Sequence, residues 1–488
     1  MGEGRPGVAA TLRALNGALG RPAPLWVKES GARNLRHRDF LAPRAALSAA
    51  FPGGQVPPEA VSAVPSLRGP AVLPLQVCRQ TPAGLAVQVR RPEAFQRLLG
   101  PLPGPASPAT GARTGCVVLH CPALRGAAAL RPRHLRSVLL ADHLAQLLRA
   151  QGVGVRLVPA LTEDRRWDIL RQLRICWPSG SGGSSLPDAV SALKAALGQC
   201  PCAAACEQGP GTAEGVIFKV HLKSFVEQQG LVGYDPNLDV LLVTEGTLWS
   251  LAELQEAVLQ CPVTPCCALL QAKGQSSCCS IIHVVNCEEE FQQQQLDVLW
   301  RILDPGKHLV CGPVKVTNPS SVQGTCCFLS CQGSLWANEA WTEVIDTLTV
   351  AAIRFEMLST AHRSQVGHIS TKGTKSGAFV MYNCARLATL FNTFQRAVER
   401  GEHQPHHSPL TSSQNSLCSE NVFALQVCKF LIQLSMDFSS YYNRVHILGE
   451  PFPHLFDQMF ARLQLLGAVR DVFHSALATL HLPPLSQI

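Results

Sequence analysis

Cysteine is the residue type in this chain with the widest chemical scope, because its thiolate binds metals and forms disulfides. The 488 residues include 20 cysteines, many of them in short clusters. The clusters are Cys200, Cys202 and Cys206; Cys261, Cys266 and Cys267; Cys278 and Cys279; and Cys326, Cys327 and Cys331. None has the paired Cys-x-x-Cys spacing of a structural zinc site. We therefore expect no metal centre, with a site shared between clusters as the alternative.

The chain gives no sign of secretion or of membrane insertion. No secretory signal is evident, so we expect free thiols, which behave as small hydrophobes when buried. No run of 18 apolar residues exists, so we expect no membrane span. We expect a cytoplasmic protein; Arg5, Arg13 and Arg21 beside a lone Glu3 leave a weak mitochondrial presequence as the alternative.

Positive charge is concentrated at the front of the chain. Residues 1–178 hold 24 Lys and Arg against 9 Asp and Glu, whereas residues 179–340 hold 7 against 15. Because phosphate contacts supply most of the sequence-independent affinity for nucleic acid, the basic part is a candidate backbone clamp and the acidic part a candidate docking surface for a protein. A merely solvated basic face is the alternative. The candidate clamp residues are Arg33, Arg36, Arg38, Arg90, Arg91, Arg131, Arg133 and Arg136.

The elements at the end of the chain are amphipathic helices. In residues 379–401, Val380, Cys384, Leu387, Phe391 and Phe394 recur at spacings of three and four, which places them on one helical face. The same spacing recurs in three later stretches, around residues 425–436, 456–463 and 469–480. Four such helices predict a bundle.

Three sequence elements in this bundle resemble a known family. They are YNCAR (382–386), FSSYYNRVHIL (438–448) and ARLQLLGAVRDVF (461–473), in this order. Together they resemble the DALR anticodon-binding bundle that closes arginyl-tRNA synthetases, over about 130 residues from position 351 onward. A generic bundle with a chance match is the alternative.

The resemblance implies that the bundle packs against the anticodon stem and loop of a tRNA. Unpaired bases are recognised by stacking on aromatic rings or guanidinium planes and by hydrogen bonds to their edges. Tyr382 and Arg386 lie four residues apart and could instead simply pack on each other. The residues that match the family motifs are Tyr382, Asn383, Arg386, Tyr442, Asn443, Arg444, Arg462 and Arg470.

The first ATP-handling motif of the synthetases is altered. Residues 130–155 resemble the stretch in which His-x-Gly-His-Leu-Arg-Ser opens a helix, but Arg131 replaces the first His and Arg133 replaces the Gly. Glycine is used where a ligand approaches the backbone closely, and an arginine side chain would fill the space of an adenine ring. His134 and Ser137 are retained.

The second motif, a cationic loop that neutralises the triphosphate, is also altered. Its best candidate, FLSCQGS (328–334), has Cys331 and Gln332 where the family has cations, and TKGTKS (371–376) comes too late in the chain. Phosphoryl chemistry depends on positioning and on positive charge at the phosphates. We therefore expect no catalytic residues, no cofactor and no arginine activation.

The remainder follows the synthetase outline and predicts an α/β plus all-α protein. A small α+β domain over residues 1–100 resembles the tRNA-contacting N-terminal domain of some arginyl-tRNA synthetases. A Pro/Gly/Ala-rich linker (101–115), a degenerate Rossmann-like core (116–340) and the helical bundle (341–488) follow it. Within the core, we expect a buried strand at 240–243 and a strand and helix over 281–303.

The resemblance implies a non-catalytic adaptor that binds arginine tRNAs and presents them to a modifying enzyme. The partner we expect is a methyltransferase that forms 3-methylcytidine in the anticodon loop; neither DNA nor a membrane is an expected partner. Two alternatives remain open: a divergent but active arginyl-tRNA synthetase, and a scaffold that uses the inherited bundle for protein contacts only.

Overall fold

The computed structural model divides the chain into two compact units, residues 1–106 and residues 107–488, and each is described by itself. The expected linker at 101–115 lies outside the described residues. The described residues are 6–20, 24–31, 33–51, 55–99, 116–125, 132–150, 152–161, 165–180, 186–206, 215–261, 279–303, 309–316, 339–360, 377–400, 424–449 and 452–487.

The first unit is an antiparallel sheet packed against helices. Its strands have the order β1-β2-β4-β3, and Leu15, Phe40 and Leu85 are fully buried between sheet and helices. Gly84 has φ +134° and an added Cβ would lie 2.0 Å from the Ala42 carbonyl oxygen, so this hairpin requires glycine. Strand β4 gives way to helix α4 at Arg91, and the mixture of helices and strands agrees with the α+β character expected of residues 1–100. The elements are α1 (Val8–Ala18), β1 (Val27–Lys28), β2 (Phe40–Pro43), α2 (Arg44–Ala50), α3 (Pro58–Ala63), β3 (Leu75–Thr81), β4 (Gly84–Val89) and α4 (Arg91–Leu99).

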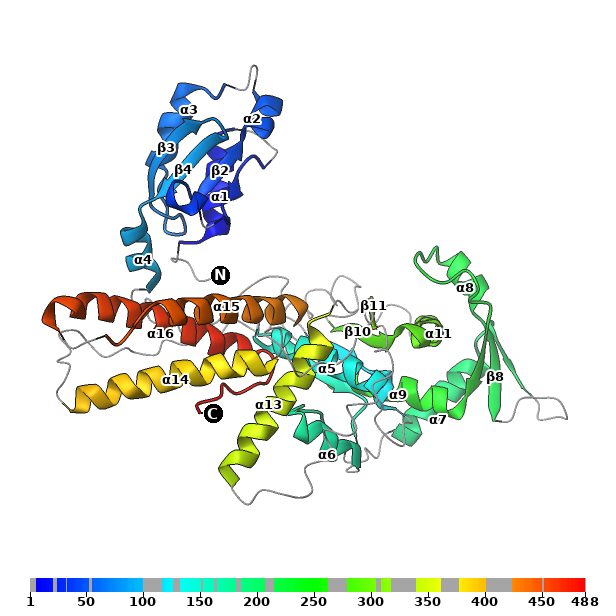
Figure 1. The fold of residues 1–488 in the computed structure, drawn as a ribbon. Helices are drawn as coiled ribbons and strands as arrows, with labels where there is room; N and C mark the ends of the chain where they lie inside the picture. Colours follow the sequence, from blue (N-terminus) through cyan, green and yellow to red (C-terminus); the bar gives the residue numbers. More distant parts are fainter. Residues whose placement is uncertain are drawn as a thin grey trace. The chain divides into compact units, whose positions relative to one another are not determined.

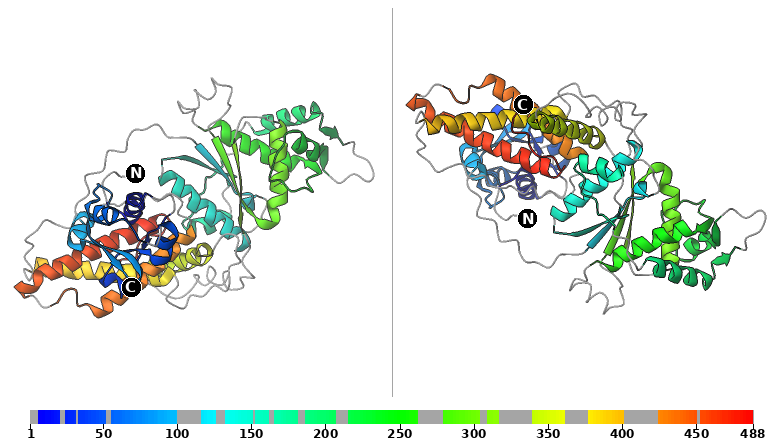
Figure 2. Two further views of the ribbon diagram at one scale, coloured as in Figure 1. Left: turned by 90° about the horizontal axis from the view of Figure 1, so that it is seen from above. Right: turned by 90° about the horizontal axis from the view of Figure 1, so that it is seen from below.

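The second unit is built on a parallel sheet with strand order β11-β10-β5-β6. Helix α5 packs on one face, in the cluster that contains Leu119 and Leu139, whereas α9 and α11 pack on the other face with Val118 and Leu299. Seen from above or below, the strands separate these two helical layers (Figure 2). The elements are β5 (Cys116–His120), α5 (Pro132–Ala150), β6 (Gly154–Val158), α9 (Glu245–Leu259), β10 (Cys279–Asn286), α11 (Glu290–Leu303) and β11 (Leu309–Val316).

A smaller antiparallel sheet with strand order β7-β8-β9 extends the core. Val220 and Val243 are fully buried and share the cluster of α9 and α11. Strand β9 confirms the strand predicted at 240–243, and β10 with α11 confirms the strand and helix predicted over 281–303. The additional elements are α6 (Arg165–Gln172), α7 (Leu186–Gly198), β7 (Ala203–Ala205), β8 (Val216–His221), α8 (Leu222–Gln228) and β9 (Val240–Thr244).

The bundle contains four long helices among the described residues, but not the four that periodicity predicts. The stretches at 456–463 and 469–480 form one continuous helix, because Leu466 and Gly467 between them are also buried and no proline interrupts them. The fourth member is α13, which precedes YNCAR. Figure 1 shows α14, α15 and α16 side by side. The helices are α13 (Glu339–Leu358), α14 (Gly377–Glu399), α15 (Ala424–Arg444) and α16 (Phe456–Ala478).

One hydrophobic cluster joins the bundle to the α5 face of the parallel sheet, and a buried ion pair crosses it. Arg354 of α13 and Asp142 of α5 lie 3.1 Å apart, with side chains 0% and 1% exposed. Arg354 also donates to the carbonyl oxygens of Leu173 and Arg174, and His481 Nδ1 lies 3.2 Å from Asp142 Oδ2. No helix of the described residues is long and apolar enough to cross a membrane.

Candidate nucleic-acid interface

An arginine between two tyrosines is the centre of the candidate site. The Arg386 guanidinium on α14 lies 4.1 Å from the ring centroid of Tyr442 on α15 and 5.3 Å from that of Tyr382. Arg386 also donates hydrogen bonds to Ser439 Oγ at 3.2 Å and to Asn443 Oδ1 at 3.0 Å. These five residues, Tyr382, Arg386, Ser439, Tyr442 and Asn443, form what we call the arginine–tyrosine cluster. Cation–π contacts and two hydrogen bonds fix the plane of the guanidinium.

The arginine–tyrosine cluster has one tyrosine ring anchored in the bundle and another that is exposed to solvent. Tyr442 makes an edge-to-face contact with buried Phe438 at 5.6 Å, which anchors its ring in the bundle. Tyr382 is 44% exposed, and Asn443 is exposed. The packing of Tyr382 on Arg386, which their spacing of four allows, is confirmed. The arrangement offers an aromatic ring, a guanidinium plane and an amide, which are the groups that recognise unpaired bases.

The other motif residues of the bundle divide between surface and interior. Arg444 is exposed and donates to the Ser440 carbonyl oxygen, and half-buried Arg462 donates to the His446 carbonyl oxygen. Arg470 lies 4.5 Å from the Phe391 ring centroid and pairs with Asp471. Asn383, by contrast, is fully buried and donates to the Phe379 carbonyl oxygen within its own helix. Asn383 is therefore not part of the interface that we propose.

Sequence reasoning missed two exposed aromatic side chains at the start of α16. Phe452 is 48% exposed and stacks on exposed His454, with ring centroids 5.7 Å apart and an interplanar angle of 16°. Both flank Pro453 and precede the helix, so no helical periodicity marks them. The sequence feature that could have indicated them is the pair of prolines, Pro451 and Pro453, which alternate with Phe452 and His454 and interrupt a helix.

The described residues that resemble the first synthetase motif lie mostly inside the protein. His134 is 6% exposed and Ser137 is fully buried, where its hydroxyl hydrogen-bonds the Asn286 side-chain oxygen at 2.8 Å. Arg136 is also fully buried and donates to the carbonyl oxygens of Met357 and Thr360 beside the bundle. Its guanidinium is engaged inside the protein, so Arg136 is not part of the proposed interface. Arg131, the side chain of Arg133, and the stretches 328–334 and 371–376 lie outside the described residues.

Two histidines meet where the carboxyl end of β5 pairs with the middle of β10. His120 Nδ1 and His283 Nδ1 lie 3.0 Å apart, and both rings are buried. One ring must donate and the other accept, so this hydrogen bond requires at least one neutral imidazole. Burial, followed by the nearby His283 and Arg125, holds the pKa of His120 well below its usual 6.5. Burial likewise lowers the pKa of His143, which faces the Thr479 carbonyl oxygen.

We expect the protein to lose stability as the pH falls below about 6.5. His120 and His143 have folded-state pKa values below 6.5, so between these values the unfolded chain binds more protons than the folded chain. Each such histidine contributes stability that is complete above the unfolded-state pKa and is lost as the pH falls toward its folded-state pKa. Urea denaturation at pH 7.5 and 5.5 measures this. A free energy of unfolding that is unchanged or higher at pH 5.5 would contradict it, and H120N should reduce the difference.

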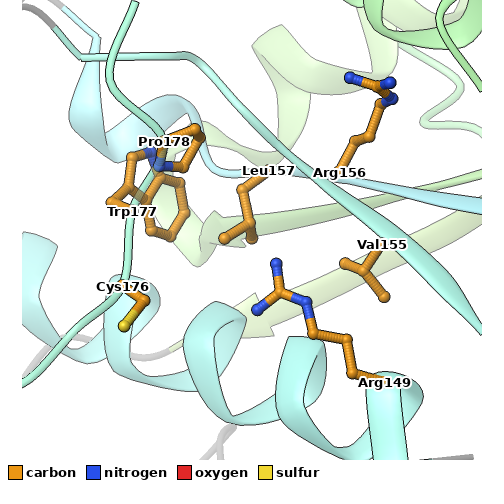
Figure 3. A pocket seen from close by; sticks show the side chains of 7 residues that line it. All are labelled: Arg149, Val155, Arg156, Leu157, Cys176, Trp177 and Pro178. Atoms are coloured by element: carbon orange, nitrogen blue, oxygen red, sulfur yellow. The ribbon is translucent and has the colours of Figure 1, made fainter.

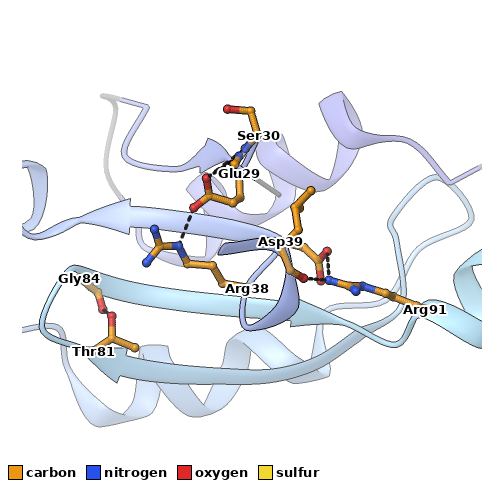
Figure 4. Close-up of polar contacts among 9 residues, drawn as sticks. Glu29, Ser30, Arg38, Asp39, Thr81, Gly84 and Arg91 are labelled. Atoms are coloured by element: carbon orange, nitrogen blue, oxygen red, sulfur yellow. Dashed lines mark hydrogen bonds and ion pairs between the residues drawn. The ribbon is translucent and has the colours of Figure 1, made fainter. Parts of the chain in front are cut away.

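Ion pairs within the first unit engage three of its five candidate clamp arginines. Arg38 pairs with Glu29 at 2.6 Å, and Arg91 with Asp39 at 3.0 Å (Figure 4). The backbone N–H of Gly31, then Arg38, lower the pKa of Glu29 to about 2. Arg90 pairs with Glu93 at 3.2 Å. Arg33 and Arg36, at a 3-10 turn, are exposed.

The cysteines form no metal cluster within the described part of the chain. No group of three or more His, Cys, Asp and Glu residues there could hold a metal ion. Cys200, Cys202 and Cys206 are half-buried thiols outside any disulfide, and the half-buried Cys261 thiol donates to the Ala257 carbonyl oxygen at 3.4 Å. Cys266, Cys267, Cys278, Cys326, Cys327 and Cys331 lie outside the described residues.

Comparison with solved structures shows which fold these elements build. Arginyl-tRNA synthetase from Thermus thermophilus superposes with a TM-score of 0.54 at 14% identity, over 98% of this chain and 100% of the synthetase. The enzyme from Plasmodium falciparum superposes equally well at 11% identity, over 100% of both chains. The chain thus has an arginyl-tRNA synthetase-like fold, which confirms the expected Rossmann-like core, helical bundle and small N-terminal domain.

Comparison of sequences gives the family. Residues 6–104 match the DALR N-terminal domain, and residues 415–488 match the DALR anticodon binding domain. The mouse protein named DALR anticodon-binding domain-containing protein 3 is 47% identical over 100% of both chains. The zebrafish (Danio rerio) protein of that name is 36% identical over 99% of both chains. The chain therefore belongs to the family of DALR anticodon-binding domain-containing protein 3.

Proposed function

We propose that this protein is a non-catalytic adaptor that binds arginine tRNAs through its helical bundle and presents them to a tRNA-modifying enzyme. The observation that carries the proposal is the arginine–tyrosine cluster, in which a fixed guanidinium lies between two rings and one ring is open to solvent. A flat, preorganised surface of this kind stacks an unpaired base with little loss of side-chain entropy. We expect the protein to act in the cytoplasm.

The charged residues near the cluster suit the phosphates on either side of a stacked base. Arg444 follows Asn443 directly at the end of α15, and Arg462 is tied to the His446 carbonyl oxygen just beyond that end. Exposed Arg33 and Arg36 offer a second basic surface in the first unit. In this proposal the arginines supply salt-dependent affinity, and the cluster recognises the loop.

Presentation of the tRNA is the step that would matter to an enzyme partner. A bundle that discriminates anticodon loops holds the substrate while another protein's active site reacts with it, so binding energy here is used for positioning. We propose an anticodon-loop 3-methylcytidine methyltransferase as this partner. Copurification of the full-length protein under gentle salt, with sequencing of bound RNA and identification of bound proteins, tests both parts. Enrichment of a few arginine tRNAs together with a methyltransferase is the expected result.

Replacing Arg386 with alanine should lower the affinity for arginine tRNA by about 10- to 100-fold, since a stacked base contributes about 1–3 kcal/mol. The change removes the guanidinium plane and releases Tyr382 and Asn443 from their positions. Filter binding or fluorescence anisotropy at fixed salt measures the effect. R396A is the matched control, because Arg396 is an exposed arginine of the same helix outside the cluster. Equal affinities for R386A and R396A would sink the proposed role of the cluster.

The two alternatives have their own tests. An active synthetase would catalyse ATP–pyrophosphate exchange that depends on arginine. Any exchange above background would overturn the proposal that the protein is not catalytic. The side chains of His134 and Ser137 are packed into the interior, which supports the expected absence of exchange. RNA binding weakens steeply as the salt concentration rises. A scaffold that binds proteins only would lack this salt-dependent tRNA binding.

A further inference from the structure

A pocket of about 350 Å³ opens at the edge of the parallel sheet, away from the arginine–tyrosine cluster. It lies between the outer strand β6, the end of α5 and the segment that follows α6 (Figure 3). Apolar side chains make up most of its wall, and none of the described residues that line it is acidic. The lining residues are Arg149, Val155, Arg156, Leu157, Cys176, Trp177 and Pro178.

The strand that borders the pocket has an open backbone edge. In the sheet order β11-β10-β5-β6, strand β6 lies at the edge and, among the residues that the structure describes, pairs as a strand with β5 alone. The Cys121 backbone N–H donates to the Val158 carbonyl oxygen at 2.8 Å, so the backbone groups of Val158 face β5. Because backbone groups alternate along a strand, those of Val155 and Leu157 point outward, along the pocket side. An open edge of this kind is a template for another extended segment.

The protein already pairs part of this edge with an extended segment of its own. Just beyond β6, the Leu161 N–H donates to the Pro178 carbonyl oxygen at 3.0 Å, and the Gly180 N–H donates to the Leu161 carbonyl oxygen at 2.9 Å. Buried Trp177 donates from Nε1 to the Pro159 carbonyl oxygen at 2.7 Å and closes the end of the pocket. The pocket thus lies along the part of the β6 edge that segment 176–180 does not cover.

Two arginines line the pocket, and their guanidinium groups are held differently. Arg149 is exposed in the last turn of α5, and its guanidinium extends toward Leu157 and the pocket interior (Figure 3). Within the described part of the chain, Arg149 has no carboxylate within ion-pair distance. Arg156 differs, because Gln260 holds its guanidinium through hydrogen bonds of 2.8 and 2.7 Å. The pocket therefore favours an occupant that places a negative charge against Arg149 beside apolar groups.

We propose that this pocket binds a short extended segment of a partner protein, which adds as a strand to the open edge of β6 and places a Glu or Asp carboxylate against Arg149. The volume suits about three residues, and alternating N–H and C=O groups on the edge match a peptide backbone. An RNA phosphate would use the arginine but would leave the backbone acceptors and the apolar wall of Val155 and Leu157 without a partner. The chemistry of the pocket thus favours an acidic peptide over RNA.

Cys176 gives a direct measurement, because it lines the pocket and is exposed. The probe is the peptide acetyl-Thr-Val-Glu-Val-Thr-amide at millimolar concentration, with its Gln and Lys counterparts in place of Glu. The rate of alkylation of Cys176 in the full-length protein is followed by peptide mass spectrometry. The Glu peptide should slow it by up to about twofold at half occupancy, and the Gln and Lys peptides should slow it less. Exposed Cys287 outside the pocket is the internal control and should react at an unchanged rate.

Variants at two positions distinguish the contribution of the Arg149 charge to peptide binding from that of the β6 backbone edge. R149A should abolish the preference for Glu over Gln, whereas R171A, at an exposed arginine outside the pocket, should retain it. V155P removes an outward N–H, which edge strands tolerate, and should abolish protection that V155A retains. No protection by any peptide, equal protection by the Glu and Lys peptides, or protection by an RNA oligonucleotide alone would overturn the proposal. These outcomes do not depend on the tRNA affinity of the bundle.

Discussion

Removing either partner of the buried ion pair between Arg354 and Asp142 should lower the free energy of unfolding by about 3–5 kcal/mol. The two side chains are 0% and 1% exposed, so D142A leaves a guanidinium charge in the interior with only carbonyl oxygens as partners. R354A leaves a buried carboxylate whose remaining neighbour is His481. Chemical denaturation followed by circular dichroism measures both variants.

The control for this prediction is an ion pair at the surface. Lys194 and Glu245 lie 3.1 Å apart, with side chains 39% and 63% exposed, so water screens their attraction. K194A should therefore change stability by less than about 1 kcal/mol. The apolar double variant with R354M and D142L should recover much of the loss, because it leaves neither charge unpaired. If D142A were no more destabilising than K194A, the buried pair would not hold the bundle to the sheet.

G377A should destabilise the same unit by about 1–3 kcal/mol, although alanine is the better helix former. Gly377 begins α14 where that helix crosses α13, and an added Cβ would lie 2.3 Å from the Ala351 carbonyl oxygen and 2.8 Å from Phe355 Cδ2. Contacts this short require the backbones of the two helices to separate. The helix that carries Tyr382 and Arg386 would move with them, so tRNA affinity should fall together with stability.

Gly246 provides the comparison, since it also lies in the first turn of a helix. An added Cβ there would meet only Thr244 Oγ1, at an ordinary contact distance of 3.8 Å. G246A should be neutral or stabilising by up to about 1 kcal/mol. Thermal unfolding of the two variants side by side is sufficient, and a G377A protein as stable as G246A would show that the helix crossing has room to adjust.

Much of the bundle follows from periodicity, because a repeat of three and four residues depends only on the chain itself. Val380, Cys384 and Leu387 are buried as their spacing predicts. The same rule places a break between 463 and 469, where the structure has none, since small buried residues such as Gly467 carry little hydrophobic signal. Local hydrophobic patterns therefore predict which face of a helix is buried better than they predict where one helix ends and the next begins.

Whether a polar side chain is buried or exposed could not be predicted from the sequence, because it depends on partners that are distant in the chain. Arg136 resembles a surface arginine by type, yet the Met357 carbonyl oxygen that it binds is 221 residues away. Asn383 and Arg386 stand three residues apart in one motif, but one points into the bundle and the other toward α15. The cluster itself exists only because α14 and α15 cross at that point, and this crossing is set by side chains along both helices.

The buried partners of α5 also set the order of events during synthesis. Asp142 is translated 212 residues before Arg354, and His143 is translated 336 residues before Thr479. At about 5–20 residues per second, the second interval lasts roughly 20 to 70 s. Throughout that time the His143 imidazole of α5 lacks its partner, and for about the first two thirds of it the Asp142 carboxylate lacks Arg354 as well. Chaperones that shield nascent chains therefore have a long period in which to act on this helix, and α5 has all of its buried polar partners only once the last helix emerges.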